Sequence, residues 1–112
     1  MAYDIEYCIN PSTKKSYFNE YLEQVDGTTR KLLLKHIDKL KSGKFGTSSP
    51  LKNNFGNCDS MYEDKVDFGK GHRIYYRFSN GKLTIASAGM KKRQRHDVIV
   101  ARGILKNKST SI

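Results

Sequence analysis

Hydrophobic and polar residues alternate along four stretches of the chain, which indicates β-strands, because successive strand side chains point to opposite faces of a sheet. The stretches are 3–9, 61–68, 72–78 and 82–88. Gly69-Lys70-Gly71 joins the second to the third, and Asn80-Gly81, a strong hairpin signal, comes before the fourth. We therefore predict at least three consecutive antiparallel strands after an N-terminal strand.

Between the first strand and the others, apolar residues recur at the spacing of a helix. The segment 17–25 predicts one helix, which Asp26-Gly27 ends, with Gly27 in the left-handed C-terminal conformation. A second helix follows, capped by Thr28 or Thr29 and ended by Gly43. Its apolar stripe consists of Leu33, Leu34, Ile37 and Leu40. Because the link is so short, the two helices form a hairpin.

The remaining segments complete an α+β chain. The segment 94–106 predicts a C-terminal helix despite Gly103, and 44–59 is rich in Gly, Ser, Asn and Lys, which is typical of a long loop. With 112 residues, one domain is expected. We place it at 1–107, followed by a flexible tail at 108–112.

The strands from 61 to 78 carry charged residues on one face. Glu63 and Lys65 share a face of the first strand, and Arg73, Tyr75 and Arg77 share the outward face of the next. If Phe68 pairs with His72, Lys65 lies opposite Tyr75 and Glu63 opposite Arg77. The register matters, because a slip of one residue would move every charge to the other face. Charges arranged in this way are suited to holding a phosphodiester.

Overall charge agrees with a polyanionic partner. The chain has 21 Lys and Arg against 11 Asp and Glu, a net charge of +10, which favours nucleic acid, although a lysine-rich soluble surface would give the same total. Cys8 and Cys58 have neither metal-ligand nor disulfide-framework spacing, which indicates a reducing compartment. The sequence has no signal peptide and no membrane-spanning stretch, so we expect a cytoplasmic protein without membrane association.

Several sequence runs resemble the RelE superfamily of bacterial toxins, and in particular its HigB-like addiction-module killer branch. The runs are Leu40-Lys41-Ser42-Gly43-Lys44-Phe45-Gly46, Tyr62-Glu63-Asp64-Lys65-Val66-Asp67, Gly69-Lys70-Gly71-His72-Arg73-Ile74-Tyr75-Tyr76, Gly89-Met90-Lys91 and Gln94-Arg95-His96-Asp97-Val98. The resemblance implies a RelE-like fold, in which the N-terminal strand and the helical hairpin pack on an antiparallel sheet that a C-terminal helix follows.

This resemblance also implies a function. It implies the toxin of a type II toxin–antitoxin system, a ribosome-dependent endoribonuclease (mRNA interferase) that cuts messenger RNA at the decoding site and stops translation. It implies a cognate HigA-like antitoxin with a helix-turn-helix domain, through which the pair would bind operator DNA. The family's functional positions map onto Glu63, Lys65, Arg73, Tyr75, Gly89 and Lys91. Lys65 stands where arginine is common, which keeps the charge but not the bidentate fork.

Cleavage of RNA without a metal uses the neighbouring 2′-hydroxyl as nucleophile and needs a base, an acid and cations on the phosphate. Arg73 is the candidate phosphate clamp, with Lys65 and Lys91 adding charge. Glu63 is either the general base or a salt-bridge partner that orders Arg77 or Lys65. Tyr75 either stacks a base, orients the phosphate, or packs at the sheet edge.

Further basic residues are candidates for gripping ribosomal or messenger backbone, namely Lys52, Arg77, Lys92, Arg93 and Arg95. The lysine-rich side of the second helix is more simply a solvated face. His72 falls on the predicted core face and His96 starts the last helix, so each has a structural interpretation. The histidines and cysteines form no recognisable cluster, so we expect neither a metal site nor a cofactor.

Two other functions remain open. A ParE-like relative would share the fold but inhibit DNA gyrase, and would not need the clustered acid, arginine and lysines. A non-catalytic RNA-binding or ribosome-binding module would also be served by the basic charge and exposed tyrosines.

Overall fold

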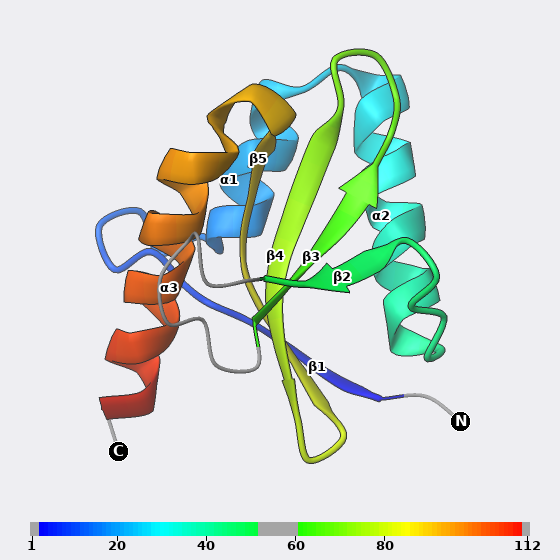
Figure 1. Ribbon diagram of the computed structural model, residues 1–112. Helices are drawn as coiled ribbons and strands as arrows, with labels where there is room; N and C mark the ends of the chain where they lie inside the picture. The colour runs from blue at the N-terminus through cyan, green and yellow to red at the C-terminus, as the bar shows by residue number, and fades with distance from the viewer. Residues whose placement is uncertain (1–2, 52–60, 111–112) are drawn as a thin grey trace.

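The computed structural model describes residues 3–51 and 61–110, with the side chains of those residues up to 106, and shows a five-stranded sheet with helices on both faces (Figure 1). The helices are α1 (Tyr17–Gln24), α2 (Gly27–Lys41) and α3 (Gln94–Thr110), with the short 3-10 helix η2 (Lys91–Arg93) before α3. The strands are β1 (Asp4–Tyr7), β2 (Ser48–Pro50), β3 (Met61–Val66), β4 (His72–Ser79) and β5 (Lys82–Met90). They lie in the order β1-β5-β4-β3-β2.

The residues that end α1 and begin α2 differ from the predicted ones. Ser16 begins α1 by accepting a hydrogen bond from the Asn19 amide, and Val25 ends it. Asp26, expected to stop α1, instead caps α2 by accepting from the Thr29 amide at 2.7 Å. Gly27 is therefore the first residue of α2 and not a left-handed C-cap, so the predicted caps Thr28 and Thr29 are wrong.

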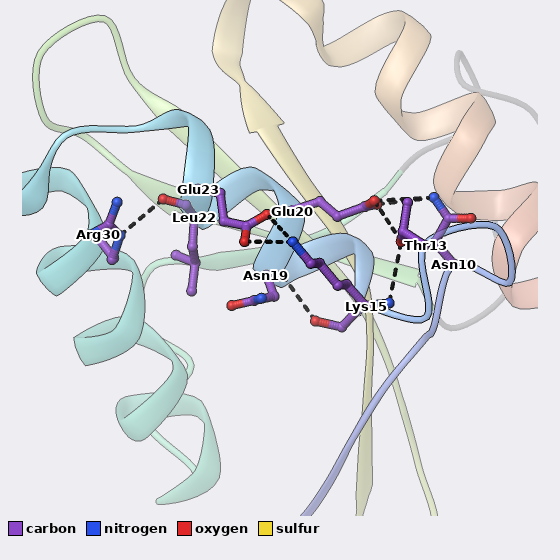
Figure 2. Close-up of polar contacts among 9 residues, drawn as sticks. Asn10, Thr13, Lys15, Asn19, Glu20, Leu22, Glu23 and Arg30 are labelled. Atoms are coloured by element: carbon purple, nitrogen blue, oxygen red, sulfur yellow. Dashed lines mark hydrogen bonds and ion pairs between the residues drawn. The ribbon is translucent and has the colours of Figure 1, made fainter.

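Polar contacts fix α1 to its neighbours (Figure 2). The Glu20 carboxylate accepts from Asn10 and from Thr13, which ties the loop before the helix to its first turn. Lys15 pairs with Glu23 at 2.9 Å, an exposed ion pair of small energetic worth. Arg30 donates to the Leu22 carbonyl and so joins α2 to α1.

The helical hairpin packs on one face of the sheet, as predicted. Its apolar stripe buries Leu33, Ile37 and Leu40, whereas Leu34 is 43% exposed. Tyr3, Ile5 and Tyr7, at alternate positions along β1 and just before it, pack against the same cluster. Ile74, Tyr76, Leu83 and Ile85 supply the sheet side of this core. We call this the α1–α2 face.

Of the two hairpins, one matches its prediction and the other does not. Asn80 and Gly81 have positive φ values of 52° and 75°, which is the two-residue turn expected for this dipeptide. The β3–β4 connection spans 67–71, so Lys65 lies opposite Arg73 and Glu63 opposite Tyr75. The predicted pairs, Lys65 with Tyr75 and Glu63 with Arg77, are wrong by two residues. Because the error is even, the set of side chains sharing each face is unchanged.

The opposite face of the sheet, which we call the α3 face, is covered by the C-terminal helix (Figure 1). Val98, Ala101 and Leu105 of α3 pack on Met61 and Tyr75, all of them at most 3% exposed. The sequence predicted an outward, polar surface there. That prediction is wrong for the middle of β4, because the apolar side of α3 needs a sheet face on which to bury.

Two features of the sheet were not expected from local patterns. Strand β2 lies inside the predicted loop 44–59, and β1 joins β5 as a parallel neighbour. The part of the predicted loop from 52 to 59, which includes Cys58, lies outside the described residues. Cys8 is buried. In the described part of the chain, no helix is long and apolar enough to span a bilayer.

Candidate functional site

Two cations lie directly opposite each other near the end of the β3–β4 hairpin. Lys65 and Arg73 are cross-strand partners, so their side chains lie next to each other on the α3 face of the sheet. Like charges in this position destabilise a sheet unless an anion lies nearby. The arrangement is therefore suited to a bound anion.

Arg73 is held by its own hairpin. The side chain is 5% exposed, and Nη1 donates to the His72 carbonyl at 2.9 Å and to Asp67 at 3.4 Å. The Asp67 side of this long ion pair is 78% exposed, whereas the Arg73 side is buried. Its carboxylate occupies a position on the guanidinium that a phosphate oxygen could take.

Lys91 adds a third cation to this end of the sheet. Its amide donates to the Gly71 carbonyl at 3.0 Å, which ties η2 to the β3–β4 loop. Gly71 has a φ of +86°, and a Cβ there would lie 3.3 Å from the Lys91 side chain and 3.9 Å from Arg73 Nη1. The Lys91 and Arg73 side chains therefore both lie close to the position that a Gly71 side chain would occupy.

Glu63 lies on the same face but under α3. The side chain is only 9% exposed, and its Oε2 accepts a hydrogen bond from Gln94 Nε2 at the start of α3. A buried carboxylate needs such donors, because burial without them is costly. Among the described residues, neither Arg77 nor Lys65 is its salt-bridge partner. That interpretation of Glu63 is not supported.

Tyr75 lies at the centre of the packing between the sheet and α3. The side chain is fully buried, and its hydroxyl has no hydrogen-bond partner among the described residues. Burial raises the pKa of this phenol strongly, and the nearby Asp97 and Glu63 carboxyls raise it further. Among the three interpretations offered by the sequence, packing has direct support, and it occurs in the middle of the sheet and not at its edge.

Of the other predicted contact residues, three follow Lys91 closely in the chain, whereas Arg77 lies opposite Met61, at the far end of the β3–β4 pairing. Lys92 and Arg93 in η2 and Arg95 in α3 are exposed, whereas Arg77 is half-buried on β4. Lys52 lies outside the described residues. These exposed cations can bind a polyanion without taking part in chemistry.

Neither His72 nor His96 is placed among the cations of the candidate site. His72 is buried on the α1–α2 face, where Nδ1 hydrogen-bonds the Tyr21 hydroxyl at 2.7 Å, and burial lowers its pKa. His96 is exposed on α3. Among the described residues, no group of three or more His, Cys, Asp or Glu side chains is placed to hold a metal ion.

The architecture is similar to that of a solved bacterial toxin structure. A double arginine-to-alanine mutant of the E. coli toxin RelE, in the free state, superposes with a TM-score of 0.55 over 91% of this chain and 98% of that one, at 17% sequence identity. The fold is RelE-like. No protein-family model and no curated protein matches the sequence.

The RelE-like fold brings two further residues to the site that were not predicted to act there. Gln94 contacts Glu63, and Asp97 lies against Gly89, where any Cβ would overlap the carboxylate. Burial raises the pKa of Asp97, while Arg93 and His96 partly offset that effect. A glycine inside a strand is a sequence signal for such a close approach. Gln94 carries no comparable signal, because its partner is 31 residues away.

Proposed function

We propose that this protein is the toxin of a type II toxin–antitoxin system and an endoribonuclease that cleaves messenger RNA on the ribosome. The observation that carries the proposal is the cation pair Lys65–Arg73, with Lys91 beside it, on a RelE-like scaffold. Three cationic residues at one end of the sheet match the charge that accumulates on a phosphodiester during cleavage. The proposal extends to the HigB-like branch of these toxins.

In the proposed reaction, the 2′-hydroxyl of the substrate attacks the adjacent phosphate, and the 5′-oxygen of the next nucleotide leaves. The products are a 2′,3′-cyclic phosphate and a 5′-hydroxyl end. Arg73 replaces its contact with exposed Asp67 by a contact with the phosphate, at small cost because the ion pair is weak. Lys65 and Lys91 neutralise the remaining charge, Glu63 accepts the 2′-proton, and a solvent water protonates the departing 5′-oxygen.

The proposed partners follow from this activity. Ribosome and messenger RNA are the targets, and the exposed residues Lys92, Arg93 and Arg95 contact their phosphates. A HigA-like antitoxin with a helix-turn-helix domain holds the toxin inactive and carries the pair to operator DNA. The protein acts in the cytoplasm, where its targets are.

The test is to map the 5′ ends of cellular messages after brief expression of the protein. We expect codon-phased cuts, and we expect Arg73→Ala to lower the single-turnover cleavage rate at least about 10²-fold while ribosome binding persists, because the phosphate clamp is removed. The charge-matched control is Lys35→Ala, an exposed cation of α2.

Other outcomes would replace the proposal. Inhibition of DNA gyrase supercoiling without message cleavage would assign the protein to ParE-like function. Ribosome binding without new 5′ ends would make it a non-catalytic binding module.

A further inference from the structure

Gln94 joins the C-terminal helix to the candidate base. It lies at the first position of α3, directly after η2, and its amide nitrogen donates to Glu63 Oε2 on β3. The Glu63 carboxylate is nearly buried, and within the described residues Gln94 is its hydrogen-bond donor. The direction of the carboxylate is therefore set by a side chain from another element.

The helix that carries Gln94 is firmly placed. Val98 and Ala101 are completely buried against the sheet, and Leu105 is 3% exposed. At the other end of the same short segment, the Lys91 amide is bonded to the Gly71 carbonyl. The backbone of Gln94 lies between these two anchors, so its side chain reaches the Glu63 carboxylate from a fixed position.

We infer that Gln94 is a positioning residue, which holds the Glu63 carboxylate in the orientation needed to accept the 2′-proton. A carboxamide neither gains nor loses a proton near neutral pH, so it cannot itself be the base. It leaves Oε1 of Glu63 as the oxygen available to the substrate. This inference rests on the proposed nuclease function, in which Glu63 is the base.

The contact has an alternative role that must be separated by experiment. In this alternative, the sole role of the hydrogen bond is to attach α3 to the sheet. Its removal would then reduce folding stability and lower activity in proportion to the unfolded fraction. A positioning role instead predicts a defect in the cleavage step of fully folded protein. Small displacements of a reacting group cost on the order of 10²-fold in rate.

The first experiment compares wild type with Gln94→Leu, which keeps the volume and removes the donor. Single-turnover cleavage of ribosome-bound message is measured together with ribosome affinity and melting temperature. We expect a drop in the cleavage rate of about 10–100-fold, with ribosome affinity within about twofold of wild type, because only the orientation of the base changes. The control is Gln24→Leu, an exposed glutamine at the end of α1.

The second experiment is a double-mutant cycle with Glu63→Gln. If Gln94 acts through Glu63, Gln94→Leu causes no further decrease in rate in the Glu63→Gln background. Additive decreases, or a Gln94→Leu rate within twofold of wild type, would overturn the inference. If Glu63→Gln itself cleaves like wild type, Glu63 is not the base, and the inference fails while the nuclease proposal stands. If wild type makes no cuts, it is the proposed function that fails.

Discussion

Arg73 Nε and the Tyr75 hydroxyl are buried with no hydrogen-bond partner among the described residues. Buried polar groups nearly always have partners, and an unpaired one costs about 1–3 kcal/mol. Both atoms belong to residues that the sequence placed in the site. For Arg73, an unpaired donor on a cation that faces Lys65 agrees with a site for an anion. For Tyr75, packing of the ring against α3 buries the hydroxyl as well, although the hydroxyl has no partner within the described part of the chain.

Asp97 predicts a pH dependence of stability at the scale of one residue. Burial raises its pKa in the folded state above the unfolded value of about 3.8. The folded protein therefore binds the Asp97 proton more tightly than the unfolded chain does. The contribution of this proton to the free energy of unfolding is fully present below about pH 3.8 and is lost as pH rises through the pKa of the folded state. Ionised Asp97 is thus a cost to the fold at neutral pH.

The measurement is urea unfolding of wild type and Asp97→Asn at several values from pH 3 to pH 7, on the order of half a unit apart. We expect the free energy of unfolding of wild type to fall relative to that of Asp97→Asn as pH rises, because asparagine cannot ionise. Some groups have a pKa shift in the opposite direction, such as the helix cap Asp26, whose pKa is lowered by the Thr29 amide. Their contributions are the same in both variants and cancel in this difference. A wild-type advantage that grows with pH would show that ionised Asp97 is stabilising.

At the scale of elements, a buried polar network joins α2, β2 and β3. Asp64 is 1% exposed and hydrogen-bonds His36 at 2.6 Å, Thr47 at 2.6 Å and Ser48 at 2.9 Å. Ser48 in turn accepts from Tyr76 at 2.8 Å. Strand β2 is therefore attached to β3 by side chains as well as by its backbone ladder, which explains how a strand forms within a polar, loop-like sequence.

Asp64→Ala is expected to destabilise the fold by about 3–5 kcal/mol, because it leaves His36 and two hydroxyls without their shared acceptor. Chemical denaturation measures the change. The comparison is Glu23→Ala, which removes the exposed Lys15–Glu23 ion pair, worth about 0–1 kcal/mol. Equal destabilisation in the two variants would mean that the Asp64 network contributes no more than a surface pair.

The elements also show how far local patterns reach. Asn80-Gly81 predicted its turn, because the required positive φ is a property of those two residues. The β3–β4 pairing was missed by two residues, because glycines at 69 and 71 permit a longer connection as easily as a short one. Glu63, Lys65 and Arg73 could still be assigned to one face, since side-chain alternation survives an even error.

At the scale of the whole molecule, the net charge of +10 predicts salt-sensitive association with polyanions. We expect Lys92→Ala, Arg93→Ala and Arg95→Ala, combined in one variant, to reduce the slope of log affinity for ribosomes against log salt. The reduction should be about 0.7 for each phosphate of single-stranded RNA that the variant no longer neutralises. Binding measured at a series of salt concentrations gives the slope.

The charge-matched control changes Lys31, Lys35 and Lys39 of α2 to alanine, because the lysine-rich side of this helix has the character of a solvated face. A slope that changes equally in both variants would mean that charge total, and not the surface around η2, governs association.

By itself, the sequence determined where the helices and all strands except β2 lie, which side chains share a face, and that cations gather on one of those faces. These are local properties, set by periods of 2 and 3.6 residues and by turn chemistry. The tertiary structure alone decided that α3 covers that face, burying Tyr75 and bringing Gln94 to Glu63. Contacts between segments distant along the chain depend on how apolar surfaces find each other in three dimensions, and no local pattern records that.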